Sequence, residues 1–284
     1  MTATCRLFGV NRQVYYRSIS RERSRQQIAT DVVLMVEQIR MRMPRLGTRK
    51  LYYLLEEKLR PLGVGRDRLF AIMKANNLQI TPKRQYHITT DSHHRFRKHK
   101  NLIESLEINR PEQVWVSDIT YIGTRANPMY LSLVTDAYSK RIMGFNVSKS
   151  LDASGAVSAM RQALKRRTYP KHQLIHHSDR GLQYCCDAYQ ERLSKHQVAC
   201  SMTESYDPYQ NAVAERINGI LKYEFILGIT TGDLILMQKL IDQSVHIYNE
   251  ERPHLSCSMK TPNEMHKQKT IKIKNYKNKI ANGS

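Results

Sequence analysis

The sequence predicts an α/β protein, in which a small all-α region precedes a five-stranded mixed sheet with flanking helices. Two observations favour this class. Residues 1–110 are basic with stretches of helical periodicity, whereas after Pro111 β-branched and aromatic runs alternate with helical segments. Three strands in a meander, followed by helix, strand, helix, strand and helix, are typical of helices packed around a mixed sheet.

Composition limits the class of protein before any element is assigned. The chain has 284 residues, of which 40% are hydrophobic, so it can bury a large core. No apolar run approaches the roughly 18 residues of a membrane span, and no signal peptide opens the sequence. The 5 cysteines form no CxxC pair, which favours a reducing, intracellular compartment.

Positive charge is concentrated toward the N-terminus. The formal net charge is +21, and residues 1–110 hold 23 Lys and Arg against 9 Asp and Glu, while residues 111–226 hold 14 against 11. This distribution is typical of a polyanion-binding arm joined to a domain with another task. Basic charge alone would also fit a ribosomal protein or a membrane-surface binder, so at this point it only favours nucleic acid as the partner.

Residues 1–30 are interpreted as a partial helix-turn-helix. Cys5 and Phe8 would pack, Gly9 would form the turn, and Val10 and Val14 would anchor the second helix. The first helix is very short, as though the motif were cut off upstream. The second helix would expose a polar set to DNA: Arg12, Gln13 and Arg17.

A second helical DNA-binding domain, helix-turn-helix-like, is expected over residues 31–81. Helical periodicity begins at Asp31 and stops at Pro44, Thr48 can cap a helix to about Leu59, and residues 66–77 follow a glycine break. Clustered charge favours DNA contact over a solvated basic face. The expected contacts are Arg49, Lys50, Arg66 and Arg68.

Residues 82–110 are polar and basic without a steady period, so we interpret them as a basic linker. Their histidines, at positions 87, 93, 94 and 99, lack cysteine partners at ligand spacing, and a metal site is not expected there.

The catalytic core is assigned to residues 111–265, and its five strands follow β-branched and aromatic runs: 114–122, 130–134, 141–147, 173–177 and 198–202. Between them, Asp152 can cap a helix to Arg167, and another helix is expected over 187–196.

The last part of the core is expected to be helical. Residues 205–225 form an amphipathic helix, Asp233 caps a helix that runs to about Tyr248, and Thr261 begins a capping box with proline at the first helical position. Residues 266–284 are expected to be a basic tail.

Three acidic residues stand where strand and helix ends could bring them together. Asp118 lies within the first core strand, Asp179 follows a short strand, and Glu215 lies on a helix face of amides and small residues. Each alone could be an ordinary surface or turn residue. Carboxylates a few ångströms apart repel unless a cation lies between them, and hard oxygen ligands select Mg²⁺ or Mn²⁺. Two such ions can activate an attacking oxygen and stabilise the leaving oxygen of a phosphodiester.

The segments around these acids resemble a known superfamily. WVSDITYI, HHSDRGLQY and YDPYQNAVAERINGILKYEF are similar to the three catalytic blocks of DDE transposases and retroviral integrases, including the 35 residues between the second Asp and the Glu. With YNEERPH (248–254) and the TPNE box (261–264), the chain resembles second-frame (OrfB-type) transposases of the insertion sequence 3 family. CRLFGVNRQVYYR and the helices of residues 31–80 are similar to the DNA-binding front of that family, so the resemblance covers about residues 3–266.

The resemblance implies an RNase H-like core that nicks an element end with water and then lets the freed 3′-OH attack a second phosphodiester. Asp118, Asp179 and Glu215 would be the catalytic ligands of two Mg²⁺ or Mn²⁺ ions. Integrases often place lysines one and two turns after the Glu; here Gly219 replaces the first, so only Lys222 carries over as a DNA contact. Asn211 is expected as a secondary contact, and no zinc is expected because the integrase zinc module is absent.

The implied partners are DNA, as terminal inverted repeats and target, and further copies of the chain, because two ends must be held together. The short first helix predicts an upstream-frame product, separate or fused by frameshifting. We expect a bacterial cytoplasmic protein associated with the nucleoid and not with a membrane. Two alternatives stay open: an RNase H-fold nuclease without strand transfer, and a catalytically silent DNA-binding regulator.

Overall fold

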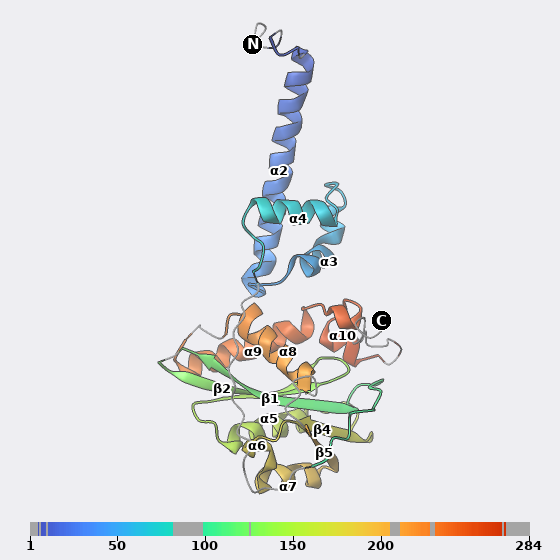
Figure 1. Ribbon diagram of the computed structural model, residues 1–284, viewed down its shortest axis with the longest axis vertical. Coiled ribbons are helices and arrows are strands. Elements are labelled where there is room, and N and C mark those ends of the chain that lie inside the picture. The colour runs from blue at the N-terminus through green and yellow to red at the C-terminus, as the bar shows by residue number, and fades with distance from the viewer. Residues whose placement is uncertain are drawn as a thin grey trace, which may run out of the picture. The chain divides into compact units, whose positions relative to one another are not determined.

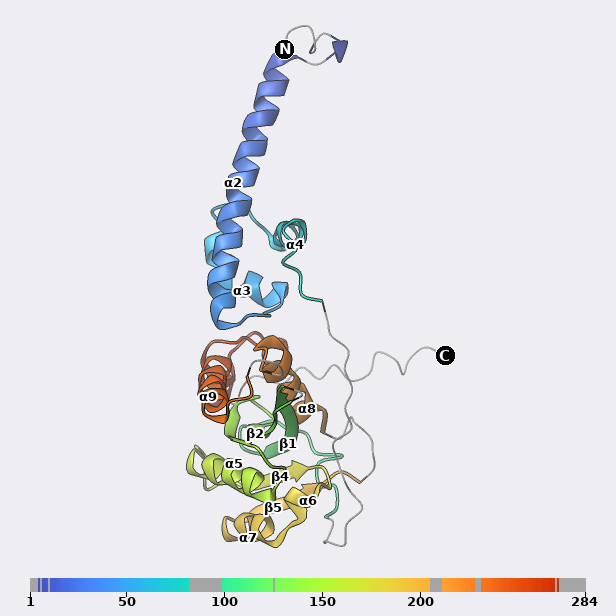
Figure 2. The same ribbon diagram turned by 90° about the vertical axis from the view of Figure 1, so that its left-hand side faces the viewer.

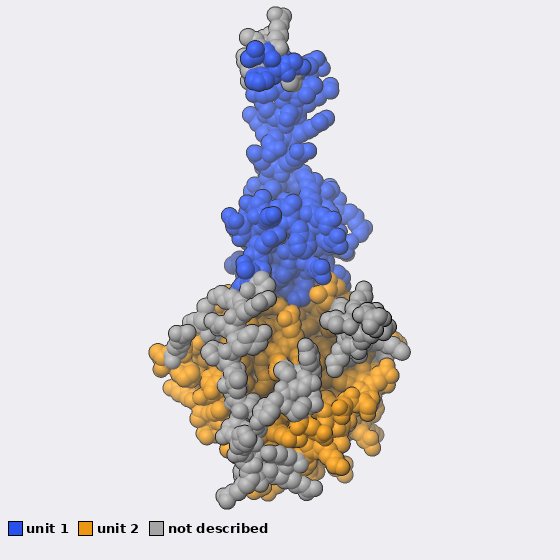
Figure 3. All heavy atoms as spheres, in the orientation of Figure 1, with its two compact units in different colours: residues 1–82 blue, residues 83–284 orange. Residues whose placement is uncertain are grey.

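The computed structural model describes residues 5, 7–9, 11–81, 99–124, 126–204, 211–227, 231–268 and 270. The chain divides into two compact units, residues 1–82 and 83–284 (Figure 3). Several sequence predictions lie outside the described residues: Val10, three of the four linker histidines, the start of the expected helix at 205–210, and the tail beyond residue 270.

The first unit is helical, and its core lies where three helices meet. α3 and α4 pack beside the C-terminal half of α2 and against each other (Figure 1). The helices are α2 (Arg12–Arg42), α3 (Thr48–Leu59) and α4 (Arg66–Ala75). The buried apolar side chains that join them include Val32, Val36, Leu51, Leu55, Leu59, Leu69 and Met73.

The expected boundary at residue 30 is wrong, because α2 runs through Asp31 without a break. Residues 12–42 contain neither glycine nor proline, so nothing in this stretch ends the helix. Asn11 is its cap, and the Asn11 side chain accepts a hydrogen bond from the backbone N–H of Gln13 at 2.8 Å. The packing expected for a helix-turn-helix is also contradicted, since Phe8 is 72% and Val14 56% exposed.

The second unit is built on the predicted five-stranded mixed sheet, with strand order β3-β2-β1-β4-β5. β1 pairs antiparallel with β2, and β2 with β3, which confirms the meander; β4 lies parallel to both β1 and β5. The strands are β1 (Val114–Gly123), β2 (Pro128–Asp136), β3 (Ile142–Ser148), β4 (Leu174–Ser178) and β5 (Val198–Met202).

Helices cover both faces of this sheet (Figures 1 and 2). One face carries α5 (Ala153–Lys165), α6 (Leu182–Cys185) and α7 (Asp187–Lys195). The other carries α8 (Ala212–Gly219), its π-helical continuation η2 (Ile220–Glu224), α9 (Leu234–Glu250) and α10 (Pro262–His266); a 3-10 turn, η3 (Leu255–Cys257), joins the last two.

Alternation along β1 sends neighbouring side chains to opposite faces. Trp115 packs in the cluster formed with α5 and α7, while Val116 packs with Ala214 of α8. Both faces of β1 are therefore buried at this point, which explains why the strand begins with three consecutive apolar residues, Val114 to Val116.

Local signals in the C-terminal part were predicted correctly. The Asp233 carboxylate accepts hydrogen bonds from the backbone N–H groups of Ile235 and Leu236, at 2.8 and 3.2 Å, and so caps α9. Thr261 and Glu264 form the expected reciprocal capping box at the start of α10. No helix in the described ranges, α2 included, is long and apolar enough to span a bilayer.

The described end of the predicted linker packs on the core. The backbone N–H of Leu102 donates to Ser201 Oγ at 2.9 Å, and that of Asn101 to Glu204 Oε1 at 2.9 Å. Three apolar residues of this segment, Ile103, Leu106 and Ile108, pack against buried residues of β1 and α8. Residues 99–110 are therefore part of the second unit.

His266 was expected to begin a basic tail, but it is only 2% exposed and joins a buried polar network. Its Nδ1 lies 2.9 Å from Ser139 Oγ, and its Nε2 lies 3.3 Å from Glu112 Oε1. Glu112 also accepts the backbone N–H groups of Thr168 and Tyr169, at 2.6 and 2.9 Å. The network fastens α10 to the loop before β1.

Opposite charges within this network shift both pKa values. Burial alone would lower the pKa of His266, but the carboxylates of Asp136 and Glu112 raise it above 6.5. Burial would raise the pKa of Glu112, but His266 and the two N–H donors lower it below 4.5. The pair is therefore strongest at pH values between the two shifted pKa values.

We expect His266→Gln to lower the free energy of unfolding by about 1–3 kcal/mol near pH 6 and by less near pH 9. The folded-state pKa is raised, so the stabilisation by His266 is complete below about 6.5 and is lost as pH rises through that raised value. Denaturant unfolding across this range would check it, with the exposed His246→Gln as control. A pH-independent difference between His266→Gln and the parent would contradict the prediction.

Candidate active site

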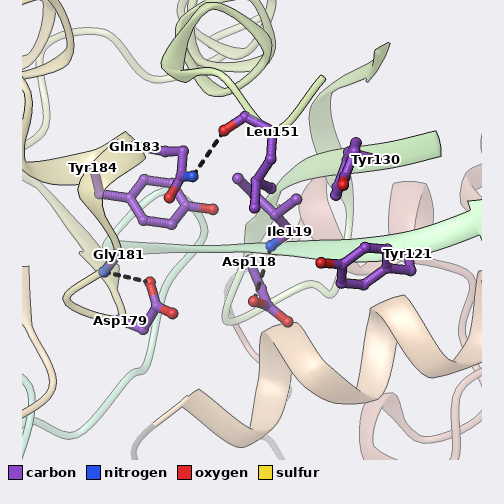
Figure 4. Close-up of a pocket in the computed structure, with 9 residues that line it drawn as sticks. All are labelled: Asp118, Ile119, Tyr121, Tyr130, Leu151, Asp179, Gly181, Gln183 and Tyr184. Atoms are coloured by element: carbon purple, nitrogen blue, oxygen red, sulfur yellow. Dashed lines mark hydrogen bonds between the residues drawn. The ribbon is translucent and has the colours of Figure 1, made fainter. Parts of the chain in front are cut away.

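Asp118 and Asp179 line one pocket in the second unit, beside the C-terminal end of β4 (Figure 4). β4 ends at Ser178, and its pairing with β1 covers Val114 to Val116, so Asp118 follows the last paired position by two residues. Carboxyl ends of neighbouring parallel strands are a common place for a site. Besides the two aspartates, the lining consists of Ile119, Tyr121, Tyr130, Leu151, Gly181, Gln183 and Tyr184.

Neutral donors hold both aspartates. Asp118 Oδ2 accepts a hydrogen bond from Asn218 Nδ2 at 2.8 Å, and its Oδ1 accepts from the backbone N–H of Ile119 at 2.9 Å. Asp179 Oδ1 accepts from the backbone N–H of Gly181 at 3.1 Å. The two carboxylates lie on the same side of β1, opposite the Tyr184 ring (Figure 4).

Glu215, on α8, affects the pKa of Asp118 through its charge. Burial raises the pKa of Asp118 to about 7, and the charge of Asp179, followed by that of Glu215, adds to the shift, while the hydrogen bond from Asn218 opposes it. Burial and then Asp179 likewise raise the pKa of Glu215. The three acids therefore form one electrostatic unit, although Glu215 is exposed and does not line the pocket.

The groups that act on the pKa of Asp118 are carboxylates, an amide and a backbone N–H, with no cation among them. Within the parts of the chain that the structure describes, no group of three His, Cys, Asp or Glu side chains could hold a metal ion as they stand. The two aspartates are in place, and Glu215 would have to turn toward them to complete a three-carboxylate site.

A buried polar junction joins the elements that carry the acids. The Ser117 carbonyl accepts a hydrogen bond from Asn211 Nδ2 at 3.0 Å, and Ser117 Oγ lies 2.8 Å from His176 Nε2. Tyr189 Oη also lies 3.0 Å from that nitrogen. Burial, aided by His177, lowers the pKa of His176 to about 3, so the ring is neutral. The junction links β1, β4 and the N-terminus of α8 without adding charge.

Two family models, both described as integrase core domain, match residues 108–208 and 196–262 of this unit. A relative from Shigella sonnei, the insertion element IS600 uncharacterized 31 kDa protein, is 32% identical over 255 residues, covering 88% of this chain and 92% of the relative. The chain belongs to the insertion-element transposases with an integrase core domain. Both aspartates fall within the first match, and Glu215 within the second.

A second insertion-sequence relative and a solved structure are also similar to this chain. Transposase InsF for insertion sequence IS3A of Escherichia coli K12 is 29% identical over 271 residues, covering 92% of each chain. Among solved structures, the simian T-cell lymphotropic virus intasome in complex with a PP2A regulatory subunit is similar, with a TM-score of 0.49 at 17% identity. That similarity covers 81% of this chain and 78% of the other.

The basic residues that were expected to contact DNA differ in exposure in this transposase. Arg12 and Arg49 are exposed. Arg66 is exposed but lies 2.9 Å from the Asp67 carboxylate, and the partly buried Arg68 donates to the Gly63 carbonyl at 3.2 Å. Lys50 is only 9% exposed, so its burial argues against a DNA contact.

The two residues expected to contact DNA near Glu215 are buried or half-buried. Asn211 is 7% exposed and donates to Ser117, which argues against its role as a secondary DNA contact. Lys222 is half-buried, with its ammonium 5.7 Å from the centre of the Tyr223 ring, and burial lowers its pKa. It lies in the π-helical turn, whose wider winding moves it away from the line through Glu215 that a regular α-helix predicts.

The hydrogen bond between Asn218 and Asp118 was not predicted from the sequence. Asn218 follows Glu215 by three residues, so both lie on one side of α8, and this spacing could have indicated the contact. The Ser117–His176 bond joins residues 59 apart in the sequence, and no local pattern indicates it.

We expect the metal-free transposase to lose stability as pH rises, because the Asp118 pKa is raised from 3.8 to about 7 on folding. Asp118→Asn should therefore be more stable than the parent, with a gain that grows through this range and levels off above it. Near pH 8 we expect a melting temperature higher by roughly 4 °C or more.

Melting curves recorded in chelator over about pH 4 to 8 would check this, with the exposed Asp242→Asn on α9 as control. A gain for Asp118→Asn that is the same at both ends of the range would show that Asp118 titrates normally in the folded protein.

Proposed function

We propose that this chain cuts phosphodiesters at the ends of an insertion element and joins the freed ends to target DNA, with Asp118, Asp179 and Glu215 as the catalytic acids. The observation that carries the proposal is the electrostatic coupling of three carboxylates from three elements of an integrase core. The printed names of the relatives, which describe transposases of insertion sequences, support it.

The three carboxylates fit hard divalent cations, and we propose two Mg²⁺ or Mn²⁺ ions per site. Asp118 is under like-charge repulsion with no cation acting on its pKa, and a bound cation would relieve that repulsion. Such ions supply an activated attacking oxygen and charge stabilisation on the leaving oxygen when bound.

The residues of the chain itself orient and shield this site. Asn218 fixes one oxygen of Asp118, and the Gly181 N–H fixes Asp179. The Tyr184 hydroxyl is deeply buried and its pKa is raised well above 10, by burial first, so it stays neutral beside the acids. The pocket therefore keeps its negative charge on the carboxylates alone.

The basic first unit is proposed to hold DNA through exposed side chains such as Arg12 and Arg49. A second copy of the chain, which would hold the other element end, stays a prediction, as does the upstream-frame fusion. The bacterial cytoplasm and nucleoid are the proposed location because the substrate is DNA.

We expect Asp118→Asn, Asp179→Asn and Glu215→Gln each to lower cleavage and joining of element-end DNA by about 10³-fold or more, with DNA affinity changed less than about twofold. Each variant removes a carboxylate while keeping the shape of the side chain. Cleavage of a labelled duplex bearing the inverted repeat measures this, with the exposed Glu191→Gln on α7 as control.

The same assay separates the alternatives. Full activity in any of the three variants would overturn the assignment of that residue. Cleavage without joining by the parent would indicate a nuclease without strand transfer, and DNA binding with neither step in Mg²⁺ or Mn²⁺ would indicate a silent regulator.

Arg49 and Lys50 form a matched pair of basic neighbours on α3, one exposed and the other buried. We expect Arg49→Gln to weaken DNA binding at all sequences and to reduce the slope of log affinity against log salt by about 1. Lys50→Gln should leave that slope unchanged. Fluorescence anisotropy over a salt series measures both, and an equal change in the two slopes would refute the contact assigned to Arg49.

A further inference from the structure

The motif YNEERPH, residues 248–254, lies outside the pocket and has no role in the proposed function so far. Four of its polar side chains are nevertheless buried in the second unit. Tyr248 is 0%, Asn249 8%, Arg252 1% and His254 6% exposed. Burying so many polar groups costs free energy unless each has a partner, so their partners indicate what the motif does.

The first half of the motif holds the edge of the sheet. Asn249 Oδ1 accepts the backbone N–H of Ile142 at 3.0 Å, and Asn249 Nδ2 donates to the carbonyl of the same residue at 3.0 Å. Ile142 begins β3, where the pairing with β2 shifts register. Tyr248 Oη donates to the Lys140 carbonyl at 2.8 Å. The end of α9 is thereby fixed to the turn between β2 and β3.

The second half holds the helix that carries Glu215. Arg252 Nε and Nη2 donate to the two oxygens of Glu224, both at 2.9 Å, in a bidentate pair. Arg252 Nη1 lies 2.8 Å from His254 Nε2, and its guanidinium lies 5.8 Å from the centre of the Tyr248 ring. The Arg252 side chain is thus engaged on several sides, which leaves it little freedom to move.

Glu224 is the last residue of η2, which continues directly from α8. A π-helical turn is rare and is maintained only where its surroundings stabilise it. α8 has only 8 residues and is fixed near its start by the Asn211–Ser117 bond. The bidentate pair between Arg252 and Glu224 fixes the other end of the same segment.

We infer that the Arg252–Glu224 pair positions α8, so that Asn218 reaches Asp118 and Glu215 stands where it can turn toward the two aspartates. A slip of one residue would rotate the helix by about 100°, which would break the Asn218–Asp118 hydrogen bond and turn Glu215 away from the aspartates. The effect of this pair on catalysis rests on the proposed function. The support that the pair gives to α8, which we call the brace, rests on the hydrogen bonds described above. Arg252 is a positioning residue, since it acts through Glu224.

Stability alone is a weaker explanation of this pair. The desolvation of a buried ion pair offsets most of its Coulomb attraction, so such pairs contribute little net stability compared with apolar replacements. The fork geometry of an Arg–carboxylate pair, in contrast, fixes the orientation of both groups. Glu224 retains 20% exposure, so the pair sits at the end of the segment rather than in its apolar core.

The test uses Arg252→Lys, which keeps the charge but loses the bidentate geometry. The matched control is Arg167→Lys, because Arg167 forms another buried pair, 3.4 Å from Glu112, with 9% and 0% side-chain exposure. Arg167 follows α5, on the opposite face of the sheet from α8. The measurements on the full chain are melting temperature, Mn²⁺ affinity by calorimetry, and kcat and KM for element-end cleavage.

We expect Arg252→Lys to lower kcat by about 10- to 100-fold and to weaken Mn²⁺ binding, with KM for DNA within about twofold. Arg167→Lys should lose a similar amount of melting temperature but keep kcat and Mn²⁺ affinity within about twofold of the parent. Glu224→Gln, which keeps the shape of the acceptor, should behave as Arg252→Lys and replaces it if the lysine variant does not fold.

Two results would overturn the inference: folded Arg252→Lys and Glu224→Gln proteins with parental kcat and Mn²⁺ affinity, or an equal loss of both in Arg167→Lys. If the parent binds Mn²⁺ but does not cut DNA, the proposed function fails. The brace is then tested by comparing the Mn²⁺ affinities of Arg252→Lys and Arg167→Lys with that of the parent. If the parent binds no Mn²⁺, the brace has no metal site to position and is overturned as well.

Discussion

Repulsion among three carboxylates is the constraint on which the rest of the second unit depends. Burial first, and then the charges of Asp179 and Glu215, raise the pKa of Asp118, so keeping the three carboxylates ionised together costs free energy. Uncharged donors hold the aspartates: the Asn218 amide and the Ile119 N–H donate to Asp118, and the Gly181 N–H donates to Asp179. A lysine or arginine in their place would neutralise the acids and occupy the position that a cation needs. The architecture therefore keeps the site negative by using neutral hydrogen bonds for positioning.

The alternation of β1 makes this arrangement possible. Ser117 points to the α7 face, where it meets His176 and Tyr189, while Val116 packs with α8 on the opposite face. The junction that aligns β1 with β4 is thus one residue away from Asp118 but on the other side of the sheet. Because the junction is fully buried, water does not compete with its hydrogen bonds, and the carboxylates remain open to the pocket.

Much of the second unit could be predicted because its signals are local. Strands follow β-branched runs, Asp233 caps α9, and Thr261 with Glu264 forms a capping box. The errors arise where tertiary packing decides. α2 continues through Asp31 because the stretch contains no helix breaker, although the apolar periodicity begins only there. Burial of Lys50, Asn211 and His266 depends on neighbours far along the chain, and composition made all three look exposed. Asp118 and Glu215 were predicted from family resemblance and context, but Asn218, which binds Asp118, was not given that role.

The helical segment that carries Glu215 is held at both ends. Glu215 is exposed as a residue, but partial burial of its carboxylate, and then the charge of Asp179, raise its pKa. An isolated helix of 8 residues is shorter than the roughly 12–15 residues that a helix needs to be stable in water, so α8 depends on contacts with the rest of the unit. Asn211 holds one end to β1, and Arg252 holds Glu224 at the other, against an α9 that Asn249 ties to β3. The YNEERPH motif therefore supports the segment that carries Glu215 without contacting any of the three acids.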